Sequence, residues 1–521
     1  MKLKSNNLRE LLERRAAENS EKIFLFSEAD GRFWSYSEFD KTVNRAANLL
    51  LKKGIKKGNV VSLLMPNSAE YIIAYFACWK IGALAGPINS LLKPEEVAFA
   101  LNNSAAKILL INSQFQNVID EISDSLPNLQ NIIVFNDEAE TTADFSENLD
   151  ETAIETGDGA IIIYTSGTTG KPKGCLLTHQ NLIANARQIT EWLGFGENDR
   201  LLTIMPLFHM NAVSVTTMTA LYASASTVVS PKFSASRFWE IISEYKITSF
   251  GSVATMLSML LQKSGQWSVV SGQFENEDQR PKTKDRKPKS LRFAMCGSAP
   301  VPAEVLKNFE ETFGCLVIEG YGLSESTCRS TFNPPNKNRR AGSCGKPIGN
   351  EMKVFDENDE EVPNGEPGEI VLRGENIFKG YFKNETATKK AFQNGWFHTG
   401  DIGYRDDDGF FYIADRKSDM IIRGGENIYP REIDELLFAH PAVQSAAVIG
   451  VPDELYGEEV AAFVVLKKNA KISEEDLINF CKKYLADFKC PKTVYFVADI
   501  PKGATGKLLK RELARLYLAK E

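Results

Sequence analysis

The sequence lacks the marks of several large classes of protein. Its eight cysteines are scattered and none are spaced as C-x-x-C, which argues against a zinc ribbon, a redox motif or a disulfide framework. The 61 Lys and Arg residues are outnumbered by 68 Asp and Glu residues, so the net charge is −7 and there is no global basic surface for nucleic acid. Glycine (36) and proline (21) occur in ordinary amounts, which excludes collagen-like, low-complexity and wholly disordered chains.

The sequence also lacks targeting and membrane signals. Residues 1–15 are charged and contain no apolar run of the secretory type, so a reducing cytoplasm is the expected compartment. Residues 201–231 contain no Asp, Glu, Lys or Arg, and this stretch is long enough for a membrane span, which needs about 20 apolar residues. It nevertheless contains Pro206, His209, Asn211 and many hydroxyl side chains. We therefore expect a buried strand, loop and helix there, and no integral membrane segment.

The first third of the chain alternates apolar strands with amphipathic helices. Residues 60–64 and 107–111 have the pattern of strands, and Ser37 is expected to cap a helix that Gly54 ends. A second helix is expected to begin at Ser68 or the residue before it. This alternation implies βαβ units and a mostly parallel sheet.

The later chain has a different pattern, with β-rich sequence and turn signals after Gly342 and a compact α+β pattern from Asp419. We predict an α/β protein with a large N-terminal domain of several subdomains, residues 1–415, which includes mostly parallel sheets and a β-rich subdomain. A hinge at 416–418 would connect it to a small mobile α+β domain at 419–521. Residues 280–292 hold seven basic residues and one acid. We expect a solvated surface loop there, and a nucleic-acid or membrane patch is the alternative.

A glycine- and hydroxyl-rich segment, TSGTTGKPKG at residues 165–174, follows an apolar strand pattern at 159–164. Such a loop suits a polyphosphate, because glycines let backbone N–H groups approach, hydroxyls donate and lysine supplies charge. The spacing is not that of a Walker A loop. The residues expected to contact phosphate are Thr165, Ser166, Gly167, Thr168, Thr169, Gly170 and Lys173.

This segment resembles the signature of the adenylate-forming superfamily, which includes acyl- and aryl-CoA ligases, peptide-synthetase adenylation domains and luciferases. Four further motifs of that family follow in order: GYGLSE at 320–325, GWFHTGD at 395–401, DRKSD with GGEN at 415–427, and PKGATGK at 501–507. The resemblance therefore covers essentially the whole chain. Residues 206–239 and 420–425 are most similar to the fatty-acyl and crotonobetaine/carnitine-CoA ligase branch.

The resemblance implies a two-step reaction with ATP, Mg²⁺ and coenzyme A. A carboxylate attacks the α-phosphate of ATP and expels pyrophosphate, and a thiol then displaces AMP from the acyl-adenylate. The catalytic residues implied are Lys507 over the α-phosphate, Glu325 as the magnesium ligand, Thr168 in the phosphate loop, and His209 between the acid and the thiol channel.

The resemblance also implies a set of nucleotide and CoA contacts. Tyr321 would stack on adenine, Asp401 would accept hydrogen bonds from the ribose hydroxyls, and Arg416 would contact ribose and phosphate. Ser324 stands where the family usually has threonine and keeps the hydroxyl. The other residues implied are Gly320 and Gly322 in the same motif, Ser298 and Ala299 beside adenine, Gly424 and Gly425 along the pantetheine, and Tyr456, Phe488 and Lys489 near the CoA nucleotide.

The substrate is only partly indicated. Amino-acid-activating relatives carry an aspartate that holds the substrate ammonium, and residues 206–213 contain none. A medium- or long-chain fatty acid is the first expectation, and a carnitine-like or aromatic acid is the second. A carrier protein in place of CoA, a luciferase-like oxygenation and a non-catalytic adenylate-binding protein are the rival functions. A homodimer is compatible with the sequence.

Overall fold

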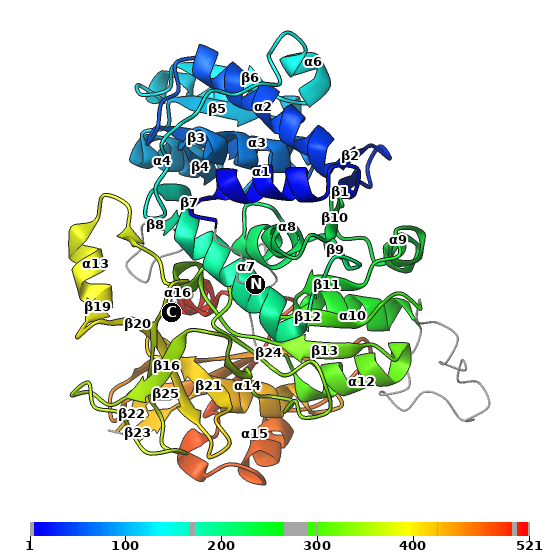
Figure 1. Cartoon of the computed structure of the whole chain (residues 1–521). Coiled ribbons are helices and arrows are strands. Elements are labelled where there is room, and N and C mark those ends of the chain that lie inside the picture. The colour runs from blue at the N-terminus through cyan, green and yellow to red at the C-terminus, as the bar shows by residue number, and fades with distance from the viewer. Residues whose placement is uncertain are drawn as a thin grey trace.

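The computed structural model describes residues 5–165, 172–264, 289–297, 301–424, 426–502 and 508–518. It confirms the α/β class, with two helix-covered, mostly parallel sheets, a β-rich part and a C-terminal α+β part. Figure 1 shows the blue elements of the N-terminal region at the top and most of the orange C-terminal elements at the bottom, while the red C-terminal helix lies near the centre of the view.

The first large sheet has seven strands. Its central strands are parallel, and β8 and β18 are antiparallel additions at one edge. In spatial order the strands are β18 (Gly380–Tyr381), β8 (Lys173–Thr178), β7 (Gly159–Thr165), β4 (Leu84–Pro87), β3 (Val60–Leu64), β5 (Ile108–Ile111) and β6 (Asn131–Val134). The edge therefore joins a strand from near residue 380 to the strands on either side of the predicted phosphate loop.

The second large sheet also has seven strands, and only β2 runs antiparallel to its neighbour. In spatial order they are β13 (Leu316–Glu319), β12 (Phe293–Cys296), β11 (Ser249–Ser252), β9 (Arg200–Thr203), β10 (Ser226–Val229), β1 (Ile23–Ser27) and β2 (Phe33–Ser35). Because the other strands are parallel, their carboxyl ends meet at one edge. Ligands in open α/β sheets bind outside that edge.

One continuous apolar core joins both large sheets and most of the helices around them, and a separate apolar cluster packs two further helices, Pro94–Ser104 and Gln116–Ile122, against the first sheet. The helices of this part are α1 (Leu8–Glu18), α2 (Tyr36–Lys52), α3 (Ala69–Lys80), α4 (Pro94–Ser104), α5 (Gln116–Ile122), α6 (Glu138–Thr142), α7 (His179–Leu193), α8 (Thr219–Tyr222), α9 (Phe238–Glu244), α10 (Ala254–Lys263) and α12 (Ala303–Phe313). Short 3₁₀ turns are η1 (Ser113–Phe115), η2 (Ser123–Ser125) and η6 (Ser324–Ser326), and η3 (Asn211–Met218) is a π-helix.

The part after Gly342 is rich in strands, as predicted, and its sheet is antiparallel. Its sheet contains β16 (Glu351–Phe355), β17 (Gly368–Arg373), β20 (Trp396–Arg405), β19 (Phe392–Gln393) and β21 (Phe411–Arg416). A separate pair is formed by β14 (Thr331–Phe332) and β15 (Lys346–Pro347), and α13 (Glu385–Ala391) follows β18.

The C-terminal part is built on a five-stranded sheet with a separate apolar cluster on each face. The strands are β23 (Glu426–Ile428), β22 (Ile421–Arg423), β25 (Gly457–Leu466), β24 (Val443–Asp453) and β26 (Thr493–Phe496). Around it lie α14 (Pro430–Phe438), α15 (Glu474–Lys482), η7 (Asp487–Lys489) and α16 (Lys510–Leu518). The domain limits at 415 and 419 stay predictions.

Two predictions about helix starts have different outcomes. The cap of α3 is Ser68, whose side chain accepts a hydrogen bond from the Tyr71 N–H at 3.2 Å. The cap predicted at Ser37 is wrong, because α2 is capped by Ser35. Ser35 accepts from the Glu38 N–H, and the Glu38 carboxylate accepts from the Ser35 N–H, so two backbone donors are satisfied reciprocally.

The uncharged stretch 201–231 folds as predicted, into buried β9, a loop, the helices η3 and α8, and β10. In the described ranges, no helix has both the length and the apolar character to cross a bilayer. Most of the basic segment 280–292 lies outside the described residues.

Candidate active site

A buried carboxylate connects two of the predicted motifs. Asp401 on β20 is only 3% exposed and stands directly opposite Arg416 in the register of β20 and β21. Its Oδ1 lies 3.0 Å from Nε of Arg416, and its Oδ2 accepts a 2.6 Å hydrogen bond from the hydroxyl of Tyr321. The motifs around residues 321, 401 and 416 therefore meet at one carboxylate, which we call the Asp401 cluster.

The charges of this cluster are mutually stabilising. The Asp401 carboxylate raises the pKa of Arg416 above its usual range. Burial, followed by the nearby Asp401 charge, raises the pKa of Tyr321, so its phenol stays protonated and donates. A carboxylate has about four lone-pair sites, and the described residues occupy two of those of Asp401. Asp401 thus keeps the capacity to accept two further hydroxyls, as a ribose diol requires.

The chain around Tyr321 is packed too tightly for side chains at the flanking glycines. A Cβ on Gly320 would lie 2.5 Å from the Phe332 ring, and one on Gly322 would lie 2.0 Å from the Cys328 carbonyl oxygen. The turn closes with Thr327 at φ +59° and Cys328 at φ +111°, two consecutive non-glycine residues in the left-handed region. Such residues cost about 1–3 kcal/mol each and persist only where the surroundings impose them, often at functional sites.

Glu325, in the 3₁₀ turn η6, is a second buried carboxylate. It accepts a 2.9 Å hydrogen bond from the hydroxyl of Tyr381, and burial raises its pKa. A divalent cation would offset the burial cost of the charged form, so the residue fits the predicted magnesium ligand. Within the described parts of the chain, no group of three or more His, Cys, Asp or Glu side chains could hold a metal. A single protein carboxylate is compatible with the usual arrangement for Mg²⁺, in which substrate phosphates and water supply the other ligands.

Tyr381 also connects Glu325 to the phosphate loop. It lies on β18, beside β8, and its ring has Lys173 Nζ 5.1 Å from its centroid. Lys173 is paired with Thr165 across the hairpin of β7 and β8. The ends of the predicted phosphate loop are thus placed near the predicted metal ligand. Sequence reasoning missed Tyr381, because it lies outside the motifs and only the sheet brings it to Glu325.

His209 lies in a loop after β9 that is held from two sides. Asn67 donates to the Met205 carbonyl at 2.8 Å and accepts from the Leu207 N–H at 2.7 Å, and Tyr75 donates to the Leu207 carbonyl at 2.7 Å. Burial lowers the pKa of His209 to about 4, so the ring is neutral at pH 7. Its Nε2 is buried with no partner among the described residues. A neutral imidazole held this way can bind a substrate atom without carrying charge.

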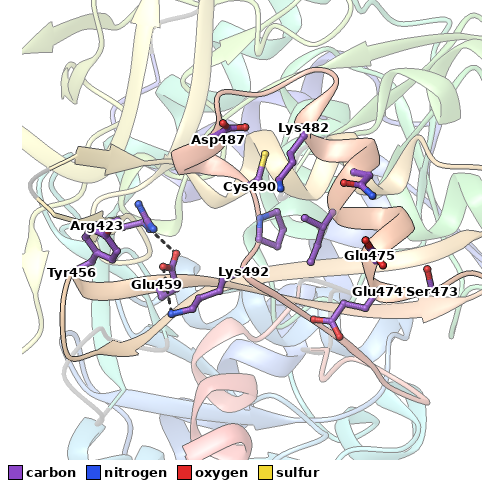
Figure 2. Close-up of a pocket in the computed structure, with 13 residues that line it drawn as sticks. Arg423, Tyr456, Glu459, Ser473, Glu474, Glu475, Lys482, Asp487, Cys490 and Lys492 are labelled. Atoms are coloured by element: carbon purple, nitrogen blue, oxygen red, sulfur yellow. Dashed lines mark hydrogen bonds and ion pairs between the residues drawn. The ribbon is translucent and has the colours of Figure 1, made fainter.

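The predicted CoA face adjoins a cavity in the C-terminal part. Gly424 has φ +59°, and a Cβ there would lie 3.2 Å from the Tyr456 ring. Tyr456 also lines a cavity of about 710 Å³, shown in Figure 2, where Arg423 and Lys492 point toward Glu459. Of the other residues predicted near the CoA nucleotide, Phe488 packs against the apolar cluster and Lys489 pairs with Glu432 at 2.8 Å.

The remaining predicted site residues lie outside the described residues, and their roles stay predictions. They are Ser166, Gly167, Thr168, Thr169, Gly170, Ser298, Ala299, Gly425 and Lys507.

The fold and the clustered motifs agree with comparisons to known proteins. Residues 12–382 match the family model of the AMP-binding enzymes, and residues 432–507 match the model of the AMP-binding enzyme C-terminal domain. The chain belongs to the AMP-binding enzymes and is an AMP-forming acid–thiol ligase. ATP and CoA are substrates of the acyl-CoA ligases in this family.

Individual relatives match over nearly their full length. The oxalate–CoA ligase of Arabidopsis thaliana is 35% identical over 93% of this chain and 94% of its own. The long-chain-fatty-acid–CoA ligase FadD13 of Mycobacterium tuberculosis is 35% identical over 93% of each chain. The crystal structure of ATP-bound MatB from Rhodopseudomonas palustris has a TM-score of 0.89 at 30% identity, covering 98% of this chain and 99% of that one.

Proposed function

We propose that the protein is an ATP-dependent acid:CoA ligase that works in two half-reactions. In the first, a carboxylate oxygen of the acid attacks the α-phosphorus of ATP, and the bond to the pyrophosphate oxygen breaks. In the second, the CoA thiol attacks the acyl carbonyl and AMP leaves with the electrons of the broken C–O bond. The observation that carries this proposal is the Asp401 cluster, where the described residues use two acceptor positions of the carboxylate and leave two for a nucleotide diol, beside a cation.

We assign the first half-reaction to residues near that cluster. Asp401 binds the ribose hydroxyls, and Arg416 supplies positive charge toward the ribose and phosphate. Glu325 contributes one ligand to Mg²⁺, which supplies charge neutralisation for the phosphates when bound. Lys173 adds positive charge at the end of the phosphate loop, and the resemblance assigns Lys507 to the α-phosphate. Repulsion between the carboxylate and the phosphates is the main barrier of this step, and positioned cations lower it by neutralising the negative charge.

We assign the second half-reaction to the C-terminal part. Gly424 has no side chain to block a thin pantetheine chain close to the backbone. We assign the phosphates of the CoA nucleotide to the cavity of Figure 2, where Lys482 is one of the lining cations. Arg423 and Lys492 in the same cavity already pair with Glu459, at 2.6 and 3.9 Å, so the CoA phosphates would compete with that carboxylate for them. CoA is therefore the proposed acceptor, and the phosphopantetheine of a carrier protein is the second candidate.

For the acid, the relatives support more than one class. FadD13 is named for long-chain fatty acids, which agrees with the medium- or long-chain acid first expected from the sequence. The plant relative is named for oxalate, a dicarboxylate. We therefore propose a carboxylic acid that lacks an α-amine, with a fatty acid and a polar acid both in the test panel.

The test is acid-dependent release of pyrophosphate from ATP, followed by thioester formation with CoA or with a holo-carrier protein. The expected result is release that requires both an acid and Mg²⁺, and one AMP formed for each acyl-CoA. Release of ADP and phosphate, or no release with fatty, aromatic, betaine-type and dicarboxylic acids, would refute the proposal. Faster transfer to a carrier protein than to CoA would select the second candidate acceptor.

A further inference from the structure

Arg329 is a buried arginine without a counterion among the described residues. Arg329 is only 1% exposed, and its Nε and Nη2 atoms are buried without a hydrogen-bond partner among those residues. Among the described residues, the guanidinium makes a single hydrogen bond, from Nη1 to the carbonyl of the preceding residue, Cys328, at 3.2 Å. A guanidinium keeps its charge in proteins, and a buried charge is strongly unfavourable unless it is paired.

The surroundings hold this arginine in place. The Arg329 carbonyl accepts hydrogen bonds from Asn185 on α7 at 2.6 Å and from Asn376 at 3.2 Å. Its guanidinium carbon lies 5.5 Å from the centroid of the Phe332 ring. The left-handed residues 327 and 328 precede it directly. These contacts therefore hold the Arg329 side chain in the interior, where water cannot hydrate it as it would hydrate a surface arginine.

The guanidinium lies at the ligand-binding edge of the second large sheet. Its Nη2 would be only 2.6 Å from a Cβ on Gly297, the residue that follows β12. Asn211 lies similarly close to Gly251 on β11, because its Oδ1 would be only 2.5 Å from a Cβ added to Gly251. Because Gly251 pairs with Met295, two residues before Gly297, both glycines face the same side of the sheet.

Asn211 shares the unusual state of Arg329. It is 4% exposed, and both its Oδ1 and its Nδ2 are buried with no partner in the described part of the chain. Residues 298–300, which follow Gly297, are Ser, Ala and Pro, so their side chains carry no carboxylate. Two buried polar groups, one of them positively charged, thus face one sheet edge without partners from the described chain. Buried polar groups are normally satisfied, so this pair points to a ligand.

We propose that Arg329 binds a second acidic group of the acid substrate, with Asn211 as an additional donor. The preferred acid is then a dicarboxylate, or a carboxylate that ends in a sulfonate, because either group can accept two parallel bonds from a guanidinium. The inference rests on the proposed acid:CoA ligase function and narrows its substrate class. A plain fatty acid would place its terminal methyl group against the buried guanidinium, and Arg329 would then have no anionic partner.

The test compares acids that differ only at the far end. Butanoate, succinate and 3-sulfopropanoate form one set, and hexanoate and adipate form another. The ratio of kcat/KM for each diacid to its matched monoacid is measured from pyrophosphate release. The variants are Arg329→Met, which keeps length without charge, and Arg329→Lys, which keeps charge without the planar fork. Arg373→Met is the matched control, because Arg373 is half-exposed and pairs only with the exposed Glu351 among acidic residues in the described ranges.

In the wild type we expect kcat/KM for at least one diacid to exceed that for its monoacid by about 100-fold or more; a site built for a polar group can reject an analogue without it by about 10⁴–10⁵. Arg329→Met should reduce that ratio by a similar factor, Arg329→Lys by less, and Arg373→Met should keep it. Faster turnover of succinate than 3-sulfopropanoate would assign the site to carboxylates, and the reverse to sulfonates.

Three results would overturn the inference. The first is a wild-type enzyme with equal kcat/KM for every monoacid and its matched diacid. This result does not depend on whether any variant folds. The second is an Arg329→Met variant that melts at the same temperature as the wild type but loses activity equally toward the diacid and its matched monoacid. Arg329 would then serve the reacting carboxylate or the fold. The third is an unchanged ratio in that variant. No pyrophosphate release with any acid would instead refute the proposed ligase function.

Discussion

Replacement of Asp401 by asparagine tests the nucleotide site most directly. The carboxylate holds Arg416 at 3.0 Å and Tyr321 at 2.6 Å, so alanine would leave two donors without an acceptor. Asparagine keeps the shape and one acceptor oxygen, and it replaces the other oxygen with a donor. The change therefore removes the negative charge and at least one acceptor position for the ribose.

The expected magnitude follows from these contacts. A hydrogen bond to a charged group contributes about 1.5–3 kcal/mol, so loss of one ribose bond should weaken nucleotide binding by about 10- to 150-fold. The free energy of unfolding should fall by less than it would for a fully buried ion pair. Breaking a fully buried ion pair costs about 3–5 kcal/mol, but Arg416 is 38% exposed and water can solvate it, so we expect about 1–2 kcal/mol.

The assay is titration of AMP and of 2′,3′-dideoxy-AMP into wild type, Asp401→Asn and Tyr321→Phe. The wild type should bind AMP more tightly than the dideoxy ligand, and Asp401→Asn should remove most of that difference. Tyr321→Phe is the matched control, because it removes the 2.6 Å hydrogen bond but keeps the aromatic ring and the Asp401 charge. If Asp401→Asn weakens both ligands by the same factor, Asp401 does not bind the diol and the assignment is wrong.

Three further changes give separate tests. Glu325→Gln should raise the Mg²⁺ concentration needed for pyrophosphate release, because a neutral amide is a poorer ligand than a carboxylate, and superimposable Mg²⁺ titrations would rule Glu325 out. Lys507→Ala should slow adenylate formation by about 10²-fold or more, the scale for one transition-state stabiliser, while a prepared acyl-adenylate still reacts with CoA; equal loss in both half-reactions would contradict this. His179 accepts a hydrogen bond from the Leu8 N–H, and burial lowers its pKa to about 4 from 6.5, so it stabilises the fold above pH 6.5 and this is lost as pH falls toward 4. The wild type should therefore lose up to about 3 kcal/mol of unfolding free energy more than His179→Gln between pH 7.5 and 4, measured by urea denaturation, and parallel pH profiles would refute the assignment.

The parts of the site that were predictable lie within contiguous motifs. Tyr321, Glu325, Asp401 and Arg416 each stand in a short segment with a recognisable pattern, and the structure brings Tyr321, Asp401 and Arg416 into contact at one carboxylate. The strand at 60–64 was also predictable, because a short apolar run bounded by turns has few other solutions.

The parts that were not predictable depend on contacts between distant segments. Tyr381 reaches Glu325 only because β18 pairs with β8, a strand some two hundred residues earlier. Arg329 carries no motif, and an arginine in a polar sequence is normally a surface residue; only its burial and missing partners single it out. The error at Ser37 was local, because Ser35 and Ser37 are both good caps and the reciprocal bond with Glu38 decides between them.

The glycines at the strand ends have a consequence for how this enzyme's substrate range could be changed. A Cβ at Gly297 would lie 2.6 Å from the Gly320 carbonyl oxygen, and a Cβ at Gly320 would lie 2.5 Å from the Phe332 ring, so neither position tolerates a side chain. At Gly251 the close contact is with the end of the Asn211 side chain alone, which can move. The side chains of Asn211 and Arg329 lie against Gly251 and Gly297, and their polar atoms other than Nη1 of Arg329 have no hydrogen-bond partner in the described part of the chain. New acid specificities should therefore be sought in libraries at positions 211 and 329, with Gly297 and Gly320 left unchanged.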